Sequence, residues 1–252
     1  MKVGVVVFPG SNCDRDMFHV LTDVFHLDAE YYWHEKGLPE NIDAVILPGG
    51  FSYGDRLRAG VIAAHSPIIK DVQKMAEQGI PVLGVCNGFQ ILVESGLLPG
   101  VLLKNESLNF MCEWTNLIVE NNMTPFTNQF QLNEKIPIPI ANGEGRYYVD
   151  DDTLKELKKK NQIVFRYSDA VNGSVNQIAG VCNEAGNVVG MMPHPERAVE
   201  SDINPIDNKP SSLIFESLLT KMGVSKCCLL YTSPSPRDAT SHLVCRLLLE
   251  NG

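Results

Sequence analysis

A tight turn that joins a strand to a helix, with a cysteine at its tip, most constrains the fold of this chain. The apolar residues 80–83 (Ile-Pro-Val-Leu) run directly into residues 84–88 (Gly-Val-Cys-Asn-Gly). Glycines two positions before and after Cys86 let the backbone turn sharply and let the helix approach the strand. The pattern therefore predicts a buried strand, a helix and a side chain presented at the turn, as in the G-x-S-x-G elbow of hydrolases.

Cys86 suits a nucleophile at that position, because the positive end of a helix favours the thiolate. The alternative is a small buried hydrophobic residue, which is the commonest role of a free cysteine. The Cys86 segment alone does not decide between the two.

A histidine between two prolines provides the second signal. His194 and Glu196 belong to the segment Pro-His-Pro-Glu at 193–196, which follows the apolar residues 188–191. Proline lacks an N–H and restricts its neighbours, so His194 is expected on a stiff loop at a strand end. A cysteine, a histidine and a carboxylate that orients the histidine make up the triad of an activated nucleophile. The alternatives are a plain surface loop and a zinc deaminase, although the Pro-Cys-x-x-Cys motif of the deaminases is absent.

A glycine-rich turn provides the third signal in the sequence. The apolar residues 42–47 pass into Pro-Gly-Gly at 48–50. Backbone N–H groups at Gly49 and Gly50, together with the N–H of Asn87, could bind the oxyanion that forms in an acyl-transfer reaction. An ordinary turn that closes a strand is the alternative.

Short apolar runs alternate with amphipathic stretches along most of the chain. Strands are expected at residues 3–8, 29–33, 44–47, 81–85, 115–119, 136–140, 163–167, 178–182 and 188–191. Helices are expected at residues 13–27, 68–78, 88–95 and 211–222. This alternation predicts an α/β fold: a flavodoxin-like, open, mostly parallel sheet with helices on both faces. Residues 100–190 contain too few helices for that pattern, so they should add antiparallel strands to one side.

Ligands of such open sheets bind beyond the carboxyl ends of the strands. Gly50, Cys86 and His194 each follow an expected strand, so we expect them to meet at one edge of the sheet. Three distant segments therefore point to one site.

Composition limits the classes of partner and the cellular compartment that suit this chain. The chain has 252 residues, 44% of them hydrophobic, and a formal net charge of −9, which argues against a nucleic-acid groove or an anionic membrane surface as partner. No apolar run approaches the ~18 residues of a membrane-spanning helix, and the first residues resemble a strand rather than a signal peptide. Seven cysteines without metal-type pairs suit a reducing cytoplasm. We expect no metal or cofactor on this chain.

The last part of the sequence departs from the α/β pattern. It contains adjacent cysteines and a Thr-Ser-Pro-Ser-Pro tract, which disfavour regular structure. We therefore expect one domain over residues 1–225 and a non-native or disordered tail over residues 226–252.

These motifs together resemble the class I, triad-type glutamine amidotransferase family. Four segments resemble one branch of it, the glutaminase subunits of phosphoribosylformylglycinamidine synthases. They are residues 8–16 (Phe-Pro-Gly-Ser-Asn-Cys-Asp-Arg-Asp), 49–55 (Gly-Gly-Phe-Ser-Tyr-Gly-Asp), 85–90 (Val-Cys-Asn-Gly-Phe-Gln) and 143–147 (Gly-Glu-Gly-Arg-Tyr).

The resemblance implies hydrolysis of glutamine to glutamate and ammonia in purine biosynthesis. Cys86 would be the nucleophile, His194 the acid and base, and Glu196 the residue that orients the histidine, while Gln90 would help to position glutamine. The chain departs from the family pattern at Asn142, where the resemblance leads us to expect histidine. The asparagine puts in doubt any role that a histidine ring would have at this position, but it does not affect the triad.

The resemblance also implies partners. The chain lacks a Gly-x-x-x-x-Gly-Lys-[Ser/Thr] phosphate loop. The resemblance implies that ATP and magnesium bind a separate large synthetase subunit. A small accessory subunit would join the complex, and ammonia would pass through an internal channel.

Three alternatives remain open. Another triad glutaminase, serving GMP, CTP or anthranilate synthesis, would share the chemistry but differ around Gly50 and Cys86. A cysteine hydrolase of γ-glutamyl compounds is the second. A flavodoxin-like binding module is the third, and it would leave Cys86, His194 and Glu196 unexplained.

Overall fold

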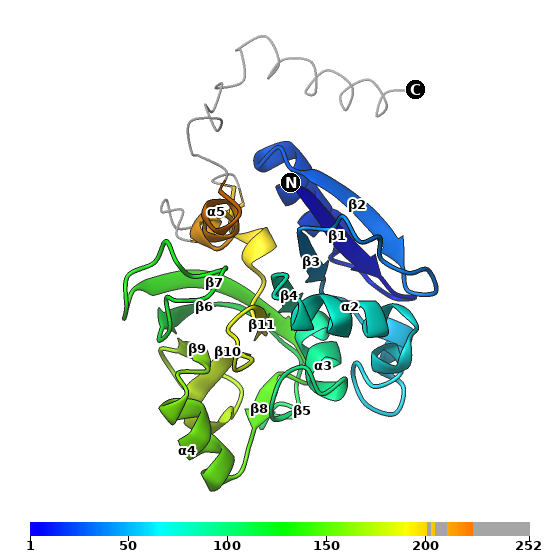
Figure 1. Ribbon diagram of the computed structural model, residues 1–252. Coiled ribbons are helices and arrows are strands. Elements are labelled where there is room, and N and C mark those ends of the chain that lie inside the picture. The colour runs from blue at the N-terminus through cyan, green and yellow to red at the C-terminus, as the bar shows by residue number, and fades with distance from the viewer. Residues whose placement is uncertain (201–202, 205–210, 224–252) are drawn as a thin grey trace, which may run out of the picture.

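A nine-stranded sheet forms the centre of the molecule (Figure 1). The computed structural model describes residues 1–200, 203–204 and 211–223. Five neighbouring strands are parallel, in the order β2 (Asp28–Trp33), β1 (Lys2–Val7), β3 (Ala44–Leu47), β4 (Val82–Val85) and β11 (Val188–Met191). This order is the one found in doubly wound, flavodoxin-like sheets.

Antiparallel strands extend the sheet on one side. From β11 the order continues through β10 (Ile178–Cys182), β9 (Ile163–Tyr167), β6 (Met111–Val119) and β7 (Lys135–Asn142). Strands β5 (Val101–Leu103) and β8 (Arg146–Tyr148) pair separately. The expected α/β class, with a parallel part and added antiparallel strands, is confirmed.

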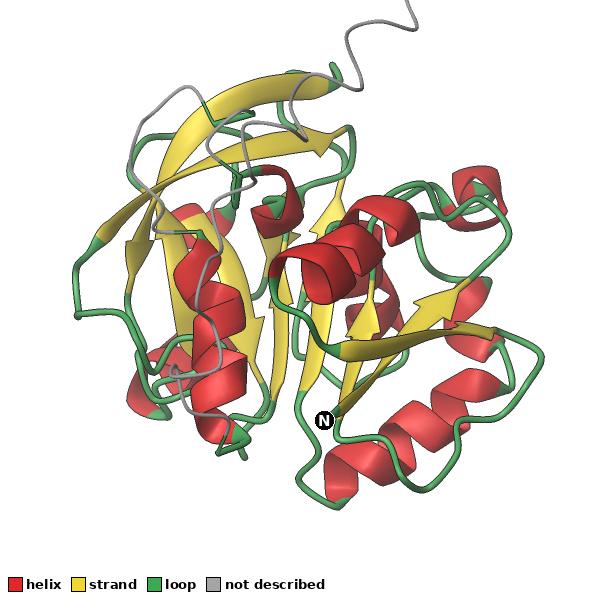
Figure 2. Cartoon of the chain, turned by 90° about the horizontal axis from the view of Figure 1, so that it is seen from above, coloured by secondary structure: helices red, strands yellow, loops and turns green. Residues whose placement is uncertain are grey.

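Helices lie on both sides of the sheet (Figure 2). They are α1 (Asp14–His19), α2 (Ile68–Glu77), α3 (Asn87–Glu94), α4 (Asp151–Lys159) and α5 (Ser212–Lys221), with short 3-10 turns at η2 (Ser52–Asp55), η3 (Ala63–His65), η4 (Val175–Gln177) and η5 (Pro195–Arg197). Helix α1 continues as a π-helical turn, η1 (Val20–Val24), beyond which the ring of Phe25 lies 5.4 Å from that of Phe215 in α5.

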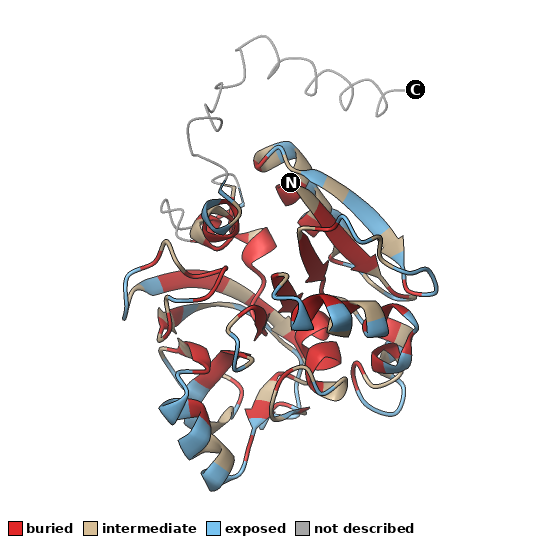
Figure 3. Ribbon diagram, viewed as in Figure 1, coloured by how far each residue is buried: buried red, intermediate tan, exposed pale blue. Residues whose placement is uncertain are grey.

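The core is deepest along the inner parallel strands β1, β3, β4 and β11, which are mostly buried, whereas the edge strand β2 is largely exposed (Figure 3). Every residue of β3 and β4 is buried, because helices cover both faces of these strands. Gly88 lets α3 approach closely, since a side chain there would collide with the carbonyl oxygen of Leu47. The second glycine of the cysteine turn therefore has the packing role that the sequence predicted.

All nine expected strands are present, with small differences in their bounds. The expectation of one regular helix over residues 13–27 is wrong, because α1 ends at His19 and a π-helical turn follows. Helix α4 and strands β5 and β8 were not expected. Helix α4 is mostly polar, but Asp150 caps its N-terminus by accepting a hydrogen bond from the Thr153 N–H at 2.7 Å.

The tail over residues 226–252 and its boundary lie outside the described residues. Within the described residues, no helix is both long and apolar enough to cross a bilayer.

Candidate active site

The parallel strands β1, β3, β4 and β11 end at the same edge of the sheet, and their loops meet there. The N–H of Cys13, after β1, donates to the carbonyl oxygen of Gly49, after β3, at 3.1 Å. The N–H of Cys86, after β4, donates to the carbonyl oxygen of Met191 at the end of β11, at 2.8 Å. Segments that are far apart in the sequence therefore form one backbone framework.

Cys86 occupies the turn between β4 and α3. Its φ of 50° lies in the left-handed region that non-glycine residues seldom adopt, and strain of this kind gathers at functional sites. The side chain is 6% exposed, and its Sγ lies 3.7 Å from the carbonyl oxygen of Ala141. The sharp elbow expected from the sequence is present.

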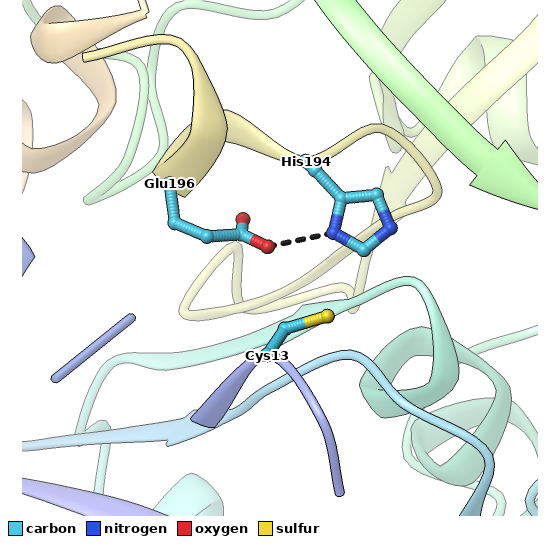
Figure 4. Close-up of side chains that lie close together, drawn as sticks. All are labelled: Cys13, His194 and Glu196. Atoms are coloured by element: carbon cyan, nitrogen blue, oxygen red, sulfur yellow. Dashed lines mark hydrogen bonds and ion pairs between the residues drawn. The ribbon is translucent and has the colours of Figure 1, made fainter. Parts of the chain in front are cut away.

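His194 and Glu196 form a buried hydrogen-bonded pair (Figure 4). The His194 Nδ1 and the Glu196 Oε1 are 2.6 Å apart, and the two residues are only 1% and 2% exposed. The loop is held by the N–H of His194, which donates to the carbonyl oxygen of Pro139 in β7 at 2.9 Å. The other ring nitrogen, Nε2, has no hydrogen-bond partner among the described residues.

The environment of His194 favours the imidazolium form. Burial would lower its pKa, but the negative charge of Glu196 and the neighbouring thiols of Cys86 and Cys13 hold the pKa well above its ordinary value. A protonated ring beside a sulfur can stabilise a thiolate and can supply a proton to a leaving group.

Gly49 brings the reactive side chains together. A Cβ atom built on Gly49 would lie 2.8 Å from the Cε1 of His194, 3.0 Å from the Sγ of Cys13 and 3.4 Å from the Cβ of Cys86. The side chains of His194, Cys13 and Cys86 therefore surround Gly49 and leave no room for a side chain at that position. The structure thus places Cys86 next to the His194–Glu196 pair.

Cys13 is a member of this cluster that the sequence did not indicate. Its buried thiol points toward His194 and Glu196 (Figure 4) and accepts a hydrogen bond from the Arg197 Nη2 at 3.0 Å. The Nε of Arg197 lies 3.6 Å from an Asp16 carboxylate oxygen and 4.0 Å from the Glu196 Oε1. Because 184 positions separate Cys13 from Arg197, no local pattern could show their contact.

The donor atoms of Cys13, His194 and Glu196 lie within 4.8 Å of one another, as metal ligands can. The 2.6 Å between Nδ1 and Oε1 is nevertheless a hydrogen-bond distance. Two ligands at ~2.0–2.1 Å from a tetrahedral zinc ion would be ~3.3 Å apart. The geometry is that of a hydrogen-bonded pair with a neighbouring thiol.

A cavity of about 270 Å³ opens beside Cys86. Its wall includes Gly50 and Gln90 from the predicted site, and the acidic residues Asp55 and Glu144. This volume lies just below the ~300–1,000 Å³ of pockets for drug-sized ligands, so it suits a small metabolite.

Hydrogen bonds of the Asn87 and Gln90 side chains connect the loops that form the cavity wall. The Asn87 Oδ1 accepts a hydrogen bond from the Ser52 N–H at 3.1 Å, and its Nδ2 donates to the Gln90 Oε1 at 2.8 Å. The Gln90 Nε2 donates in turn to the carbonyl oxygen of Glu144 at 2.8 Å. Asn87 is the first residue of α3, where a backbone N–H has no partner within the helix. Gly50, on the opposite loop, has a φ of 152°.

Asn142 also lines the cavity. It is buried, and both atoms of its side-chain amide lack a hydrogen-bond partner among the described residues. Its carbonyl oxygen accepts a hydrogen bond from the Asn105 Nδ2 at 2.9 Å. The position at which the chain departs from the expected histidine is therefore part of the wall.

Comparison with known proteins identifies the family. A family model described as a CobB/CobQ-like glutamine amidotransferase domain matches residues 1–220. The chain belongs to the glutamine amidotransferase family. The structure of PurLQS from Thermotoga maritima contains a chain 50% identical to this one, with a TM-score of 0.79 over 88% of this chain and 98% of that chain.

Two more distant glutamine amidotransferase-like structures share the fold. A putative GMP synthase component from Thermoplasma acidophilum is 15% identical, with a TM-score of 0.54 over 87% of this chain and 92% of that chain. A glutamine amidotransferase from Thermotoga maritima is 15% identical, with a TM-score of 0.53 over 97% of this chain and 94% of that chain. The family expected from the Cys86, Gly49–Gly50 and His194 motifs is confirmed.

Proposed function

We propose that this glutamine amidotransferase is the glutaminase subunit of a phosphoribosylformylglycinamidine synthase. It hydrolyses glutamine and delivers ammonia to a synthetase subunit, which converts formylglycinamide ribonucleotide to the amidine with ATP. The observation that carries the proposal is the buried His194–Glu196 pair beside Cys86, in a chain 50% identical to one in PurLQS. The four branch-specific sequence segments support the same assignment.

The first half of the reaction forms a thioester. The Cys86 thiolate attacks the side-chain amide carbon of glutamine, and the N–H groups of Gly50 and Asn87 hold the resulting oxyanion. Gly49 leaves the space in which sulfur and imidazole meet. Protonated His194 gives its proton to the amide nitrogen, the C–N bond breaks, and ammonia leaves.

The second half releases glutamate. Neutral His194 takes a proton from water, the hydroxide attacks the thioester, and the C–S bond breaks. The thiolate and the imidazolium are then restored. Through this cycle Glu196 keeps the Nδ1 of His194 as a donor and directs the Nε2 toward the reacting atoms. Gln90 holds the wall against which glutamine binds.

The mouth of the cavity suits a protein partner. Leu108 is 79% exposed, and Phe51 and Phe110, whose ring centres are 6.3 Å apart, are exposed as well. All three residues line the cavity. Exposed apolar residues grouped in this way are typical of interaction sites. We assign the surface of these three residues to the large synthetase subunit, which would carry ATP and magnesium.

The remaining parts of the proposal follow from the fate of ammonia. A small accessory subunit would complete the complex, and a channel would lead ammonia from Cys86 to the synthetase. Free thiols at Cys13 and Cys86 fit a reducing, cytoplasmic setting.

The test is amidine formation from glutamine, formylglycinamide ribonucleotide, ATP and magnesium, with the synthetase subunit supplied with and without this chain. We expect glutamine to support the reaction only when this chain is present. Ammonia release from glutamine should be slow for the isolated chain and faster when the synthetase is added. Amidine formation that never depends on this chain would contradict the proposal.

A further inference from the structure

A second cavity lies at the end of the edge strand β2, away from Cys86. Its volume is about 570 Å³, which is within the ~300–1,000 Å³ of pockets for drug-sized ligands. The ends of β1 and β2, the first residues of α1 and the turn after β2 form its wall. It shares no lining residue with the cavity beside Cys86. Glutamine hydrolysis therefore leaves this cavity without a function.

Two aromatic side chains form one part of the wall. Tyr31 and Trp33 are two positions apart on β2, so they point to the same face of the strand, and they are 44% and 40% exposed. The Tyr31 ring stacks on that of Phe18 in α1, with the ring centres 4.3 Å apart, and the Trp33 ring lies 4.6 Å from that of buried His34. Both rings are therefore held by neighbours and still present exposed area, on which a planar ligand can stack.

Two cationic side chains form another part. Arg15 at the start of α1 and Lys36 in the turn after β2 are both exposed. The N–H of Lys36 donates to the carbonyl oxygen of Trp33 at 2.8 Å, which keeps the lysine next to the aromatic residues. Neither cationic side chain forms an ion pair or a hydrogen bond with a residue that the structure describes, whereas Arg58, for example, pairs with Glu94. Guanidinium and ammonium groups in this state can bind a phosphate group.

Asp14 is the third charged residue of the wall. Its carbonyl oxygen lies 3.5 Å from the Tyr31 hydroxyl, so the start of α1 packs against β2. The Asp14 carboxylate would repel a bare anion but can accept a hydrogen bond from a hydroxyl group. The ligand that suits the cavity therefore combines an anionic group with a neutral polar part.

A nucleoside phosphate has all the groups that these side chains can bind. We propose that the cavity at the end of β2 is a binding site for a nucleoside phosphate. The base stacks on Tyr31 and Trp33, the phosphate group binds Arg15 and Lys36, and a sugar hydroxyl donates to Asp14. Ligands of open α/β sheets bind at this position, beyond the carboxyl ends of parallel strands. The site is separate from the glutaminase centre and does not depend on it.

Two other occupants use less of the wall. Inorganic phosphate would leave the exposed rings of Tyr31 and Trp33 unused. An apolar protein segment would cover those rings but leave the charges of Arg15 and Lys36 without a partner.

The experiment is equilibrium dialysis of the full chain with radiolabelled AMP. We expect saturable binding of a single AMP per chain, with a Kd below about 1 mM. Adenosine and inorganic phosphate should each compete at least tenfold less well than AMP, because the first lacks the charged contact and the second lacks the stacked ring. Glutamine should not compete, since the two cavities share no residue.

Two variants separate the parts of the site. Arg15→Gln should weaken AMP binding about tenfold and leave adenosine binding unchanged. Trp33→Leu should weaken the binding of both about tenfold, because both contain the base. Lys155→Gln is the matched control for a lost charge, since Lys155 is exposed on α4, and it should bind AMP like the wild type. Circular dichroism of each variant checks that it is folded.

Tryptophan fluorescence locates the ligand. The chain has two tryptophans, and Trp114 lies on β6, in the antiparallel part of the sheet. AMP should quench the fluorescence of the wild type, and the quenching should disappear in Trp33→Leu. Quenching that persists in Trp33→Leu would place the ligand elsewhere and overturn the site.

Three further results would overturn the proposal. They are the absence of saturable AMP binding up to about 1 mM, inorganic phosphate that competes as well as AMP, and AMP binding that Arg15→Gln and Trp33→Leu both leave unchanged. None of these results bears on the glutaminase assignment, because each is measured by binding rather than by ammonia release.

Discussion

The Oε1 of Glu196 and the Nδ1 of His194 are joined by a 2.6 Å hydrogen bond that is sealed from solvent. The bond makes Nδ1 a donor and leaves Nε2, which has no partner among the described residues, free to exchange a proton with the reacting groups. The elevated pKa of His194 is a consequence of the same pairing, acting against burial.

Replacing Glu196 with glutamine should therefore slow thioester formation by about 10²–10⁴-fold, because the ring loses its orientation and its counter-charge. Rapid-quench measurement of a single turnover reports this step directly. Members of a triad act as a unit, so Glu196→Gln should cost almost nothing further in a Cys86→Ala background. An unchanged rate of thioester formation in Glu196→Gln would exclude the carboxylate from the machinery.

The cysteines should differ in their reactivity toward two kinds of reagent. Cys112 is exposed on β6, so a maleimide should modify it first. An electrophilic glutamine analogue should instead modify Cys86, which lines the cavity. Peptide mapping by mass spectrometry separates the outcomes. Modification of Cys13 by the glutamine analogue before Cys86 would mean that the nucleophile is misassigned.

Cys13 should tune His194 without acting as a nucleophile. The closeness of its thiol to the ring contributes to the raised pKa of His194. Catalysis requires protonated His194, so activity falls as pH rises through that pKa. Cys13→Ala should lower the pKa and shift the alkaline limb of the kcat profile to lower pH, with a loss of kcat of roughly tenfold or less. Labelling of Cys86 by the glutamine analogue should persist, and an unshifted alkaline limb would contradict this role.

Asp55 should reduce stability at neutral pH, because its pKa rises from 3.8 to about 6 on folding. The neutral form is favoured in the folded state, so stability is highest below pH 3.8 as far as this group is concerned and is lost as pH rises through 6. Asp55→Asn cannot ionise and should be more stable than the wild type at pH 7.5, on the order of 1 kcal/mol given partial exposure.

The advantage of Asp55→Asn should shrink between pH 7.5 and pH 5. Urea unfolding at both values measures it, with Asp152→Asn as the control. An advantage that grows as pH falls would reverse the sign of this effect.

The parts of the site that follow strands could be predicted from the sequence. Gly50, Cys86 and His194 each come directly after a short apolar run, and parallel strands bring their carboxyl ends to one edge. The motifs around Cys86 and His194 also identified the family. Local pattern and parallel topology were sufficient for this much.

The parts of the site that depend on contacts between loops could not be predicted from the sequence. Asp55 and Glu144 lie on loops with no periodicity and far apart in the sequence, yet both line the cavity beside Cys86. The contact of Cys13 with Arg197 could not be predicted either, since 184 positions separate the two residues in the sequence. Helix α4 was missed because its polar face outweighs its apolar one.

The most direct test of the central claim is the ratio of glutamine-dependent to ammonia-dependent amidine formation by the complex containing Cys86→Ala. The claim is that Cys86, with His194 and Glu196, supplies ammonia to a synthetase partner. Glutamine-dependent formation should fall to background, whereas added ammonia should support the reaction at the wild-type rate. Glutamine-dependent formation that persists at the wild-type level in Cys86→Ala would contradict the account.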